Sequence, residues 1–187
     1  MIVNDIFSSF FAVDFLDIDN DSIVNFCYNN IQSSGKNSGS LLLEETCFQD
    51  LLYETQTRLN EIHTHVGLSD NFEQYIWRYW ANLNQTEDIG SPHCHPESFL
   101  SCVYYAKACG KSSGRLEFLT PTNQMIPVVQ NKMIDTYTKY ISPTWWIDPE
   151  PGKLVIFPSW LWHFVNKNTS GEDRISIAID TKVRIKK

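Results

Sequence analysis

Hydrophobic residues follow one spacing in the first third of the chain and another in the rest. Residues 44–68 carry apolar side chains close to a helical repeat, which places them on one face of a helix. These positions are Phe48, Leu51, Leu52, Leu59 and Ile62. Residues 19–32 begin with Asp and Asn residues suited to helix capping, and a Ser- and Gly-rich break follows at residues 33–40. The pattern predicts two helices separated by a flexible link.

From about residue 72 onward, the apolar residues occur in short runs rich in aromatic and β-branched side chains. Clusters of Pro, Gly, Asn and Ser separate these runs, and no helical pattern stands between them to build a parallel sheet. The clearest runs cover residues 75–84, 98–107, 114–121, 152–160, 161–167 and 174–183. The pattern predicts a mainly β fold, either a sandwich or a jelly roll.

The length of 187 residues suits one domain with a sizeable core. We therefore predict a single domain over residues 1–187. Within it, residues 1–70 form a helical support region, and residues 71–187 form the β core.

The charge and the composition argue against nucleic acid and membranes as binding partners. A formal net charge of -7 with scattered Lys and Arg argues against a nucleic-acid binder, and the basic tail at residues 182–187 is interpreted as a solvated terminus. No stretch approaches the roughly 20 apolar residues of a membrane span, and the acidic N-terminus is unlike a signal peptide. We therefore predict a cytoplasmic protein without a membrane partner. The five cysteines form no CxxC pair, so we expect free thiols.

Two histidines stand two positions apart in the segment SPHCHPES, with a glutamate two positions beyond them. Alternate side chains of an extended strand share a face, so His93, His95 and Glu97 can point the same way. Two histidines and a carboxylate form the facial triad of non-heme Fe(II) sites, which leaves three positions open on an octahedral ion. The spacing predicts two ligands here and a third ligand from a distant strand.

His163 is the candidate for that distant ligand. A turn at Pro151 and Gly152 leads into an apolar strand, and Pro158 interrupts the pairing of this strand before His163. A lone histidine among aromatic residues is more often a satisfied core residue than a ligand. Support for a ligand has to come from elsewhere in the sequence.

Arg174 and Ser176 give that support. The polar segment NKNTSGED joins the His163 strand to the alternating segment RISIAI, and we expect the two strands to form a hairpin. The apolar positions of the second strand are Ile175, Ile177 and Ile179. Arg174 and Ser176 therefore fall on the opposite face, near the metal, where a guanidinium and a hydroxyl can bind one carboxylate of a dicarboxylic acid.

The order of these segments, H-x-H, SCVYY, GRLEF, PGKLVIFPSWLWH and RISIA, resembles that of the 2-oxoglutarate and Fe(II)-dependent oxygenases. Within that superfamily, the chain is similar to a subgroup of small hydroxylases common in marine phages and bacteria. Their pattern has a histidine pair before SGVYYL, and FPSWLxH before an Arg-x-Ser strand. The resemblance covers roughly residues 76–184, and its motifs are specific in combination.

The resemblance implies a double-stranded β-helix, or jelly roll, with N-terminal helices packed on one sheet. It also implies that His93, His95 and His163 hold Fe(II), although His95 stands where the superfamily usually has an acidic residue. An alternative triad begins at His95 and uses Glu97, with His93 beside the metal or the substrate. We favour the three histidines because the subgroup pattern keeps the histidine pair.

The resemblance further implies a binding site for the co-substrate 2-oxoglutarate. Arg174 and Ser176 would bind its 5-carboxylate, with Tyr105 as a second hydrogen-bond donor. Tyr104 is one position out of phase and should face the opposite side, while either tyrosine can also be an ordinary core residue. Asn82 either lines the same pocket or closes a strand end.

Four tryptophans stand near His163 in the sequence and could form a substrate wall. Large residues more often fill and seal a small barrel than recognise a substrate, so we expect packing. The four are Trp145, Trp146, Trp160 and Trp162.

The function implied is oxidative decarboxylation of 2-oxoglutarate by Fe(II) and O2, coupled to hydroxylation of a C–H bond. The substrate is expected to be a protein or peptide residue such as proline, by analogy with the family. If the chain is encoded by a phage, its location would be the host cytoplasm. Two alternatives remain: a cupin-like β-barrel that binds Zn or Ni without oxygenase activity, and a structural protein with a vestigial site.

Overall fold

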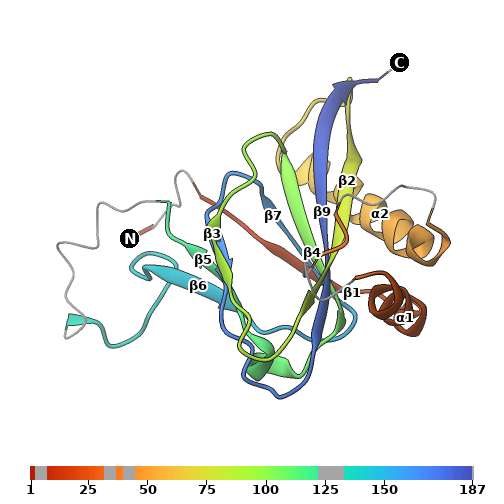
Figure 1. Cartoon of the computed structure of the whole chain (residues 1–187). Coiled ribbons are helices and arrows are strands. Elements are labelled where there is room, and N and C mark those ends of the chain that lie inside the picture. The colour runs from red at the N-terminus through yellow and green to blue at the C-terminus, as the bar shows by residue number, and fades with distance from the viewer. Residues whose placement is uncertain (3–7, 32–36, 40–44, 122–132, 187) are drawn as a thin grey trace.

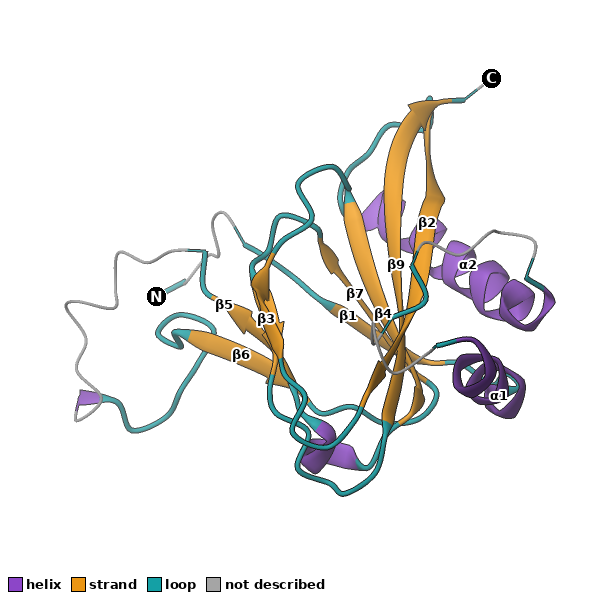
Figure 2. Cartoon of the chain, viewed as in Figure 1, coloured by secondary structure: helices purple, strands orange, loops and turns teal. Residues whose placement is uncertain are grey.

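The chain folds into two antiparallel β-sheets that face each other, with two helices covering the outer face of the larger sheet (Figures 1 and 2). This computed structural model describes residues 1–2, 8–31, 37–39, 45–121 and 133–186. The predicted mainly β fold is confirmed, and the two facing sheets form a double-stranded β-helix.

The larger sheet has five strands, and each strand runs antiparallel to its neighbours. Apolar and polar residues alternate along the last strand, and this alternation determines which face of the strand each side chain occupies. Ile175, Ile177 and Ile179 pack toward the helices, while Arg174 and Ser176 face the smaller sheet. In spatial order the strands are β1 (Ala12–Phe15), β7 (Lys153–Pro158), β4 (Leu100–Lys107), β9 (Arg174–Ile185) and β2 (Phe72–Asn84).

The smaller sheet has four short strands. In spatial order they are β3 (Gly90–His93), β8 (His163–Val165), β5 (Leu116–Leu119) and β6 (Thr144–Ile147). The sequence pattern did not predict β1 or β6, and the extended strand expected to carry His93, His95 and Glu97 is β3, which ends at His93. Strands β1 and β6 have four residues each, which is too short for a period of two to stand out from its surroundings.

The two helices are α1 (Asn20–Asn30) and α2 (Gln49–His65). The side chain of Asp19 caps α1 by accepting a hydrogen bond from the Ser22 amide, as the capping pattern predicts. A short 3-10 helix, η1 (Thr46–Phe48), forms the first turn of the segment predicted as one long helix. A second, η2 (Gly110–Ser113), follows β4. No helix within the described ranges is long and apolar enough to cross a membrane.

The apolar core has two parts, one on each face of the larger sheet. The part beneath the helices includes Ile23, Phe48, Leu51 and Leu59, whose side chains are fully buried. The part between the two sheets is smaller, and its members are Tyr105, Leu116, Phe118, Ile147, Val155, Phe157 and Leu161. The helices therefore support the sheet from outside and leave the space between the sheets to other residues.

The expected hairpin between the His163 strand and the Arg174 strand is not formed. Strand β8 pairs with β3 and β5, whereas β9 pairs with β4 and β2 in the other sheet. The polar connection crosses from one sheet to the other, and buried Asn168 holds it by donating to the carbonyl oxygens of Asn84 and Glu172. Arg174 and His163 therefore lie in two facing sheets and not on neighbouring strands of one sheet.

Candidate functional site

Three histidine side chains converge between the two sheets. His93 ends β3 and lies directly opposite His163 at the start of β8, while His95 follows in the loop after β3. One ring nitrogen of each histidine lies within 4.8 Å of the corresponding nitrogen of the other two. His95 and His163 are buried and His93 is exposed, so the cluster opens to solvent on the His93 side.

The second nitrogen of each ring has a hydrogen-bond acceptor. His93 Nδ1 lies 2.7 Å from the Ser91 carbonyl oxygen, and His163 Nδ1 lies 2.9 Å from the Leu161 carbonyl oxygen. His95 Nδ1 lies 2.7 Å from Asp180 Oδ1. Because these acceptors require a proton on each Nδ1, the Nε2 lone pairs remain available to a metal ion.

The surroundings of His163 favour its neutral imidazole. Burial, with smaller contributions from the neighbouring His93 and His95, lowers the pKa of His163 to about 4, against the effects of a hydrogen bond to the Leu161 backbone carbonyl and of the Asp180 charge. A neutral imidazole is the form that binds a metal. The His163 side chain is thus ready to bind a cation at neutral pH.

Glu97 does not join this cluster. Strand β3 ends at His93, and the chain then turns, with the Ser98 amide donating to the His95 carbonyl oxygen. The strand alternation that would align Glu97 with the histidines therefore stops before it is reached, and the Glu97 side chain is exposed. Among the described residues, the group able to hold a metal consists of His93, His95 and His163.

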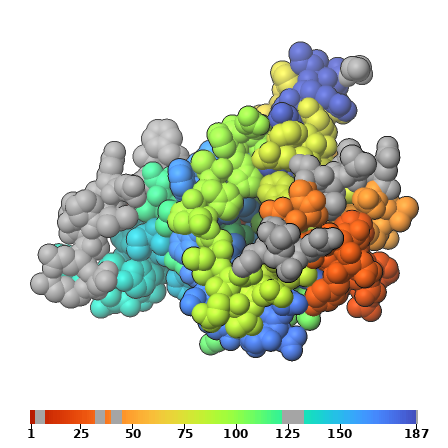
Figure 3. Space-filling model, in the orientation of Figure 1, coloured from red at the N-terminus to blue at the C-terminus, as the bar shows by residue number. Residues whose placement is uncertain are grey.

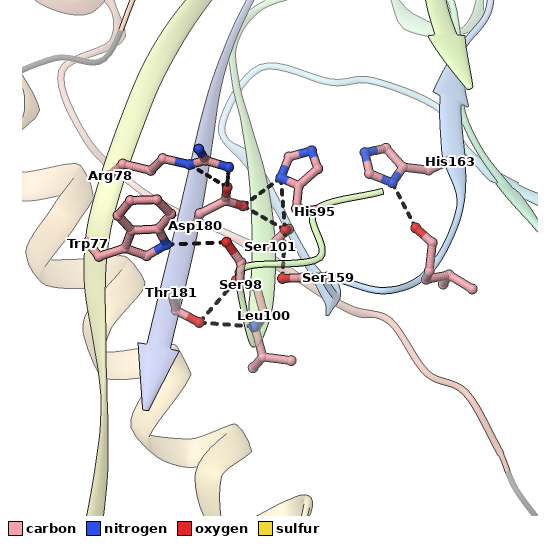
Figure 4. A network of polar contacts seen from close by, with 11 residues as sticks. Trp77, Arg78, His95, Ser98, Leu100, Ser101, Ser159, His163, Asp180 and Thr181 are labelled. Atoms are coloured by element: carbon pink, nitrogen blue, oxygen red, sulfur yellow. Dashed lines mark hydrogen bonds and ion pairs between the residues drawn. The ribbon is translucent and has the colours of Figure 1, made fainter. Parts of the chain in front are cut away.

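A buried carboxylate that the sequence reasoning missed lies directly behind His95. Asp180 is fully buried on β9, and its Oδ1 accepts hydrogen bonds from His95 Nδ1 and Ser101 Oγ while Oδ2 accepts from Arg78 (Figure 4). Burial alone would raise the pKa of Asp180, but these hydrogen bonds and charges lower it. The alternation of RISIAID, with Asp180 in phase with Arg174, was a signal that could have identified it.

Three of the residues predicted to bind the co-substrate form one row across the larger sheet. Asn82 and Tyr105 both lie directly opposite Ser176, one on each side. Directly opposite residues of antiparallel strands share a face, so the three side chains point together into the space between the sheets. Tyr104 points the other way, into the core beneath the helices, as its phase predicts.

Arg174 stands next to this row and is 2% exposed. Its Nη1 donates to the carbonyl oxygens of Ser113 and Gly114, and its Nη2 donates to Asn84 Oδ1. Gly114 has φ +91, and an added Cβ would lie 2.9 Å from Arg174 Nη1, so glycine is needed for this close approach. The guanidinium is thus held by neutral groups.

Two polar atoms beside the row lack a partner. Arg174 Nε and the Tyr105 hydroxyl are buried without a hydrogen bond, a state that costs free energy unless a ligand completes it. Burial raises the pKa of Tyr105 to about 12, against the effect of the nearby Arg174 charge. Burial also lowers the pKa of Arg174. The nearby Asp88 charge acts in the opposite direction on the pKa of Arg174. A protonated hydroxyl and a guanidinium whose described hydrogen bonds go to neutral groups are suited to an anion.

Asp180, which contacts His95, and Ser176 are separated along β9 by a small residue. Asp180, behind His95, and Ser176 lie four positions apart on the same face, which is ~13 Å at ~3.3 Å per residue. Ala178 stands between them, opposite Trp80 on β2 and Val103 on β4. The short Ala178 side chain leaves this part of the interior less filled than a larger residue would.

The four tryptophans near His163 are not packed as expected. Their exposed fractions are 40% for Trp145, 44% for Trp146, 52% for Trp160 and 51% for Trp162. The apolar interior between the sheets is filled instead by Phe118, Phe157 and their neighbours. The sequence-based expectation of packing is therefore wrong for these residues.

The matching family is described as "Putative 2OG-Fe(II) oxygenase", and the match covers residues 78–180, more than half of the chain. The chain belongs to the 2-oxoglutarate and Fe(II)-dependent oxygenase family. Fe(II) and 2-oxoglutarate are the metal and the co-substrate of this enzyme family, and the match includes all three clustered histidines. No curated protein sequence matches the chain.

Solved structures of oxygenases share the fold at low sequence identity. A prolyl-4-hydroxylase from Pseudomonas putida has a TM-score of 0.62 and 14% identity over 92% of this chain and 91% of that chain. A viral collagen prolyl hydroxylase from Paramecium bursaria Chlorella virus-1 has a TM-score of 0.58 and 11% identity, covering 94% and 90%. An oxidoreductase of the 2OG-Fe(II) oxygenase family from Burkholderia pseudomallei has a TM-score of 0.54 and 14% identity over 76% of this chain. The chain spans 59% of that longer protein.

Proposed function

We propose that this oxygenase hydroxylates a C–H bond, with His93, His95 and His163 holding Fe(II) and the Arg174 pocket holding 2-oxoglutarate. The observation that carries the proposal is that three imidazoles with available Nε2 atoms share one interior with a buried arginine whose described hydrogen bonds all go to neutral groups. A metal site without enzyme activity gives no reason to bury such an arginine, because burial of an unpaired charge is costly.

The pocket around Arg174 supports binding of the far carboxylate of 2-oxoglutarate. The unpartnered Arg174 Nε and the Tyr105 hydroxyl can donate to it, and Ser176 and Asn82 extend the same polar row. Hydrogen bonds between charged groups are about twice as strong as neutral ones. A carboxylate placed here would pair the buried charge and satisfy two buried donors together.

Fe(II) held by the three histidines would, with 2-oxoglutarate and O2, supply oxidative decarboxylation to succinate and CO2 and transfer of one oxygen atom to a C–H bond. The chain contributes orientation and exclusion of water. Phe118 and Phe157 pack against His163, with ring centroids 6.4 and 4.8 Å away, and shield that side of the cluster. The chemistry requires no acid or base from the protein, and we assign none.

We propose a protein or peptide residue, such as proline, as the group that is hydroxylated. Trp145 supports this class of substrate. It lies opposite Phe118, which lies opposite His163, so Trp145 shares the inner face with the ligands and is 40% exposed. An exposed indole near the reactive centre can pack against a prolyl ring. Membership of the subgroup found in marine phages and bacteria, and a cytoplasmic location, remain predictions.

The proposed activity can be tested by measuring turnover. Purified protein with Fe(II) and 2-oxoglutarate should consume O2 and form succinate, and a library of proline-containing peptides should identify those that gain the mass of one oxygen atom. Arg174→Gln should abolish succinate formation, while the matched variant Arg184→Gln, at an exposed arginine paired with Glu73, should retain it. Equal succinate formation by wild type and Arg174→Gln would contradict the proposed pocket.

A further inference from the structure

The three histidine ligands differ in what lies behind them. The Nδ1 atoms of His93 and His163 face neutral backbone carbonyl oxygens. His95 Nδ1 instead faces the carboxylate of Asp180 at 2.7 Å. The facial triad of non-heme Fe(II) sites includes one carboxylate, whereas the clustered ligands here are three histidines. The three ligands therefore carry no negative charge themselves, but the carboxylate of Asp180 lies directly behind one of them, His95.

Asp180 is held in place from two sides, by Ser101 and by Arg78. Ser101 Oγ donates to Oδ1 at 2.7 Å, and the Ser159 hydroxyl in turn lies 2.8 Å from Ser101 Oγ. On the other side, Arg78 Nε and Nη2 both donate to Oδ2, at 2.8 and 2.7 Å. Figure 4 shows the carboxylate between Arg78 and His95, with the other edge of the His95 ring turned away from it. A side chain bound this firmly fixes the orientation of the ring that it contacts.

An irregularity in β2 brings Arg78 to this carboxylate. Pairing of β2 with β9 runs regularly from Phe72 to Ile76 and then shifts by one residue, so that Arg78, and not Trp77, lies opposite Asp180. Ser101 lies opposite Asp180 on its other side. The result is a row of Arg78, Asp180 and Ser101 across the larger sheet. A bulge that re-aims a side chain is a feature often found beside functional sites.

We propose that Asp180 is a positioning residue that supplies, through His95, the negative charge that a carboxylate ligand supplies in the usual triad. This inference rests on the proposed function, since it concerns the same three ligands. Three neutral imidazoles leave the full +2 charge on a bound Fe(II), whereas one carboxylate would reduce it. A carboxylate that accepts a hydrogen bond from Nδ1–H makes Nε2 of the same ring more basic and fixes the tautomer.

Direct measurement of metal binding tests this role without turnover. We expect Asp180→Asn, which keeps the shape and removes the charge, to weaken Mn(II) binding to the metal-free protein by ~10- to 100-fold, measured by calorimetry in the absence of 2-oxoglutarate. The visible spectrum of the Co(II) complex should also change, because it reports the ligand field at the ion. Unchanged Mn(II) affinity and an unchanged Co(II) spectrum in a folded Asp180→Asn protein would overturn the proposal.

A second variant separates charge from structural support. Arg78→Gln removes the cation that shares Asp180 and leaves the carboxylate facing His95, so Mn(II) affinity should stay the same or rise. A structural role would instead make both variants bind the metal more weakly. A loss of Mn(II) affinity in folded Arg78→Gln would therefore overturn the proposal even if Asp180→Asn fails to fold. Ser101→Ala, which retains the charge, should lose less affinity than Asp180→Asn.

Failure of this inference can be distinguished from failure of the proposed function. If wild-type protein binds neither Mn(II) nor 2-oxoglutarate, the proposed function fails and takes this inference with it. If wild type binds both and Asp180→Asn binds Mn(II) equally well, the proposed function stands and Asp180 supports the fold alone.

Discussion

Each histidine of the cluster carries two ring nitrogens, and the partner of one nitrogen determines how the other is used. Backbone carbonyl oxygens hold His93 and His163, and a carboxylate holds His95. Because the three acceptors belong to the protein, the orientation of the rings does not depend on a bound metal. The residues themselves could be predicted from the H-x-H spacing and the distant His163, but their hydrogen-bond partners could not, since two of these are main-chain atoms.

Burial of neutral His163 makes the stability of the metal-free protein depend on pH. The folded pKa of about 4 lies below the unfolded value of 6.5, so between these values the unfolded chain binds more protons and stability falls as the pH falls. Between pH 7.5 and pH 5, His163 should lower the free energy of unfolding by about 2 kcal/mol. Urea unfolding of wild type and His163→Gln at several pH values should show that the free energy of unfolding depends less on pH in the variant. An equal pH dependence in the two proteins would contradict a buried, neutral His163.

Replacement of Glu97 distinguishes the two candidate triads. Because Glu97 is exposed and lies outside the cluster, Glu97→Ala should bind Mn(II) with wild-type affinity. His95→Ala removes one of the three clustered nitrogens, and its affinity should fall by more than tenfold. Calorimetric titration of both variants measures the difference. Loss of metal binding in Glu97→Ala would restore the alternative triad of His95, Glu97 and His163.

At the scale of elements, alternation predicted the faces of long strands and failed at connections. The period of two in β9 correctly assigned Ile175, Ile177 and Ile179 to one core and Arg174 to the opposite face. The same pattern could not show that the segment before β9 crosses to the other sheet. A polar segment has the same composition whether it forms a hairpin turn or connects two sheets. The irregularity in β2 was equally hidden, since one extra residue leaves no signature among aromatic neighbours.

Helix α2 gives a test of how the N-terminal region supports the sheet. Leu59 is fully buried against the outer face of the larger sheet, and Leu59→Ala leaves a cavity there, so stability should fall by about 2–5 kcal/mol. The space between the sheets lies on the other side, so the folded variant should keep its affinity for Mn(II). Urea unfolding and calorimetry measure the two quantities. A loss below about 1 kcal/mol would show that the helix contributes little.

At the scale of the whole molecule, the site depends on how the two sheets face each other. The smaller sheet supplies the row of His93, His163 and Phe118, and the larger sheet supplies Asp180 and the Arg174 pocket. The segment around β3, drawn in lime green, runs down the middle of the face seen in Figure 3, between the N-terminal helices and the β5–β6 region. The sequence predicted the fold class and the residues on each strand, but the distances between them arise from the packing of strands far apart in the chain.

The most direct test of the proposed metal and 2-oxoglutarate sites is anaerobic thermal unfolding of the metal-free protein with Mn(II), with and without 2-oxoglutarate. At about 100 times its dissociation constant, 2-oxoglutarate should add roughly 2.7 kcal/mol to the stability of the Mn(II)-loaded wild type and of the control Arg184→Gln. It should add nothing to Arg174→Gln. Stabilisation by Zn(II) alone without any effect of 2-oxoglutarate would contradict the proposed oxygenase site. A 2-oxoglutarate effect that survives in Arg174→Gln would contradict the role of Arg174.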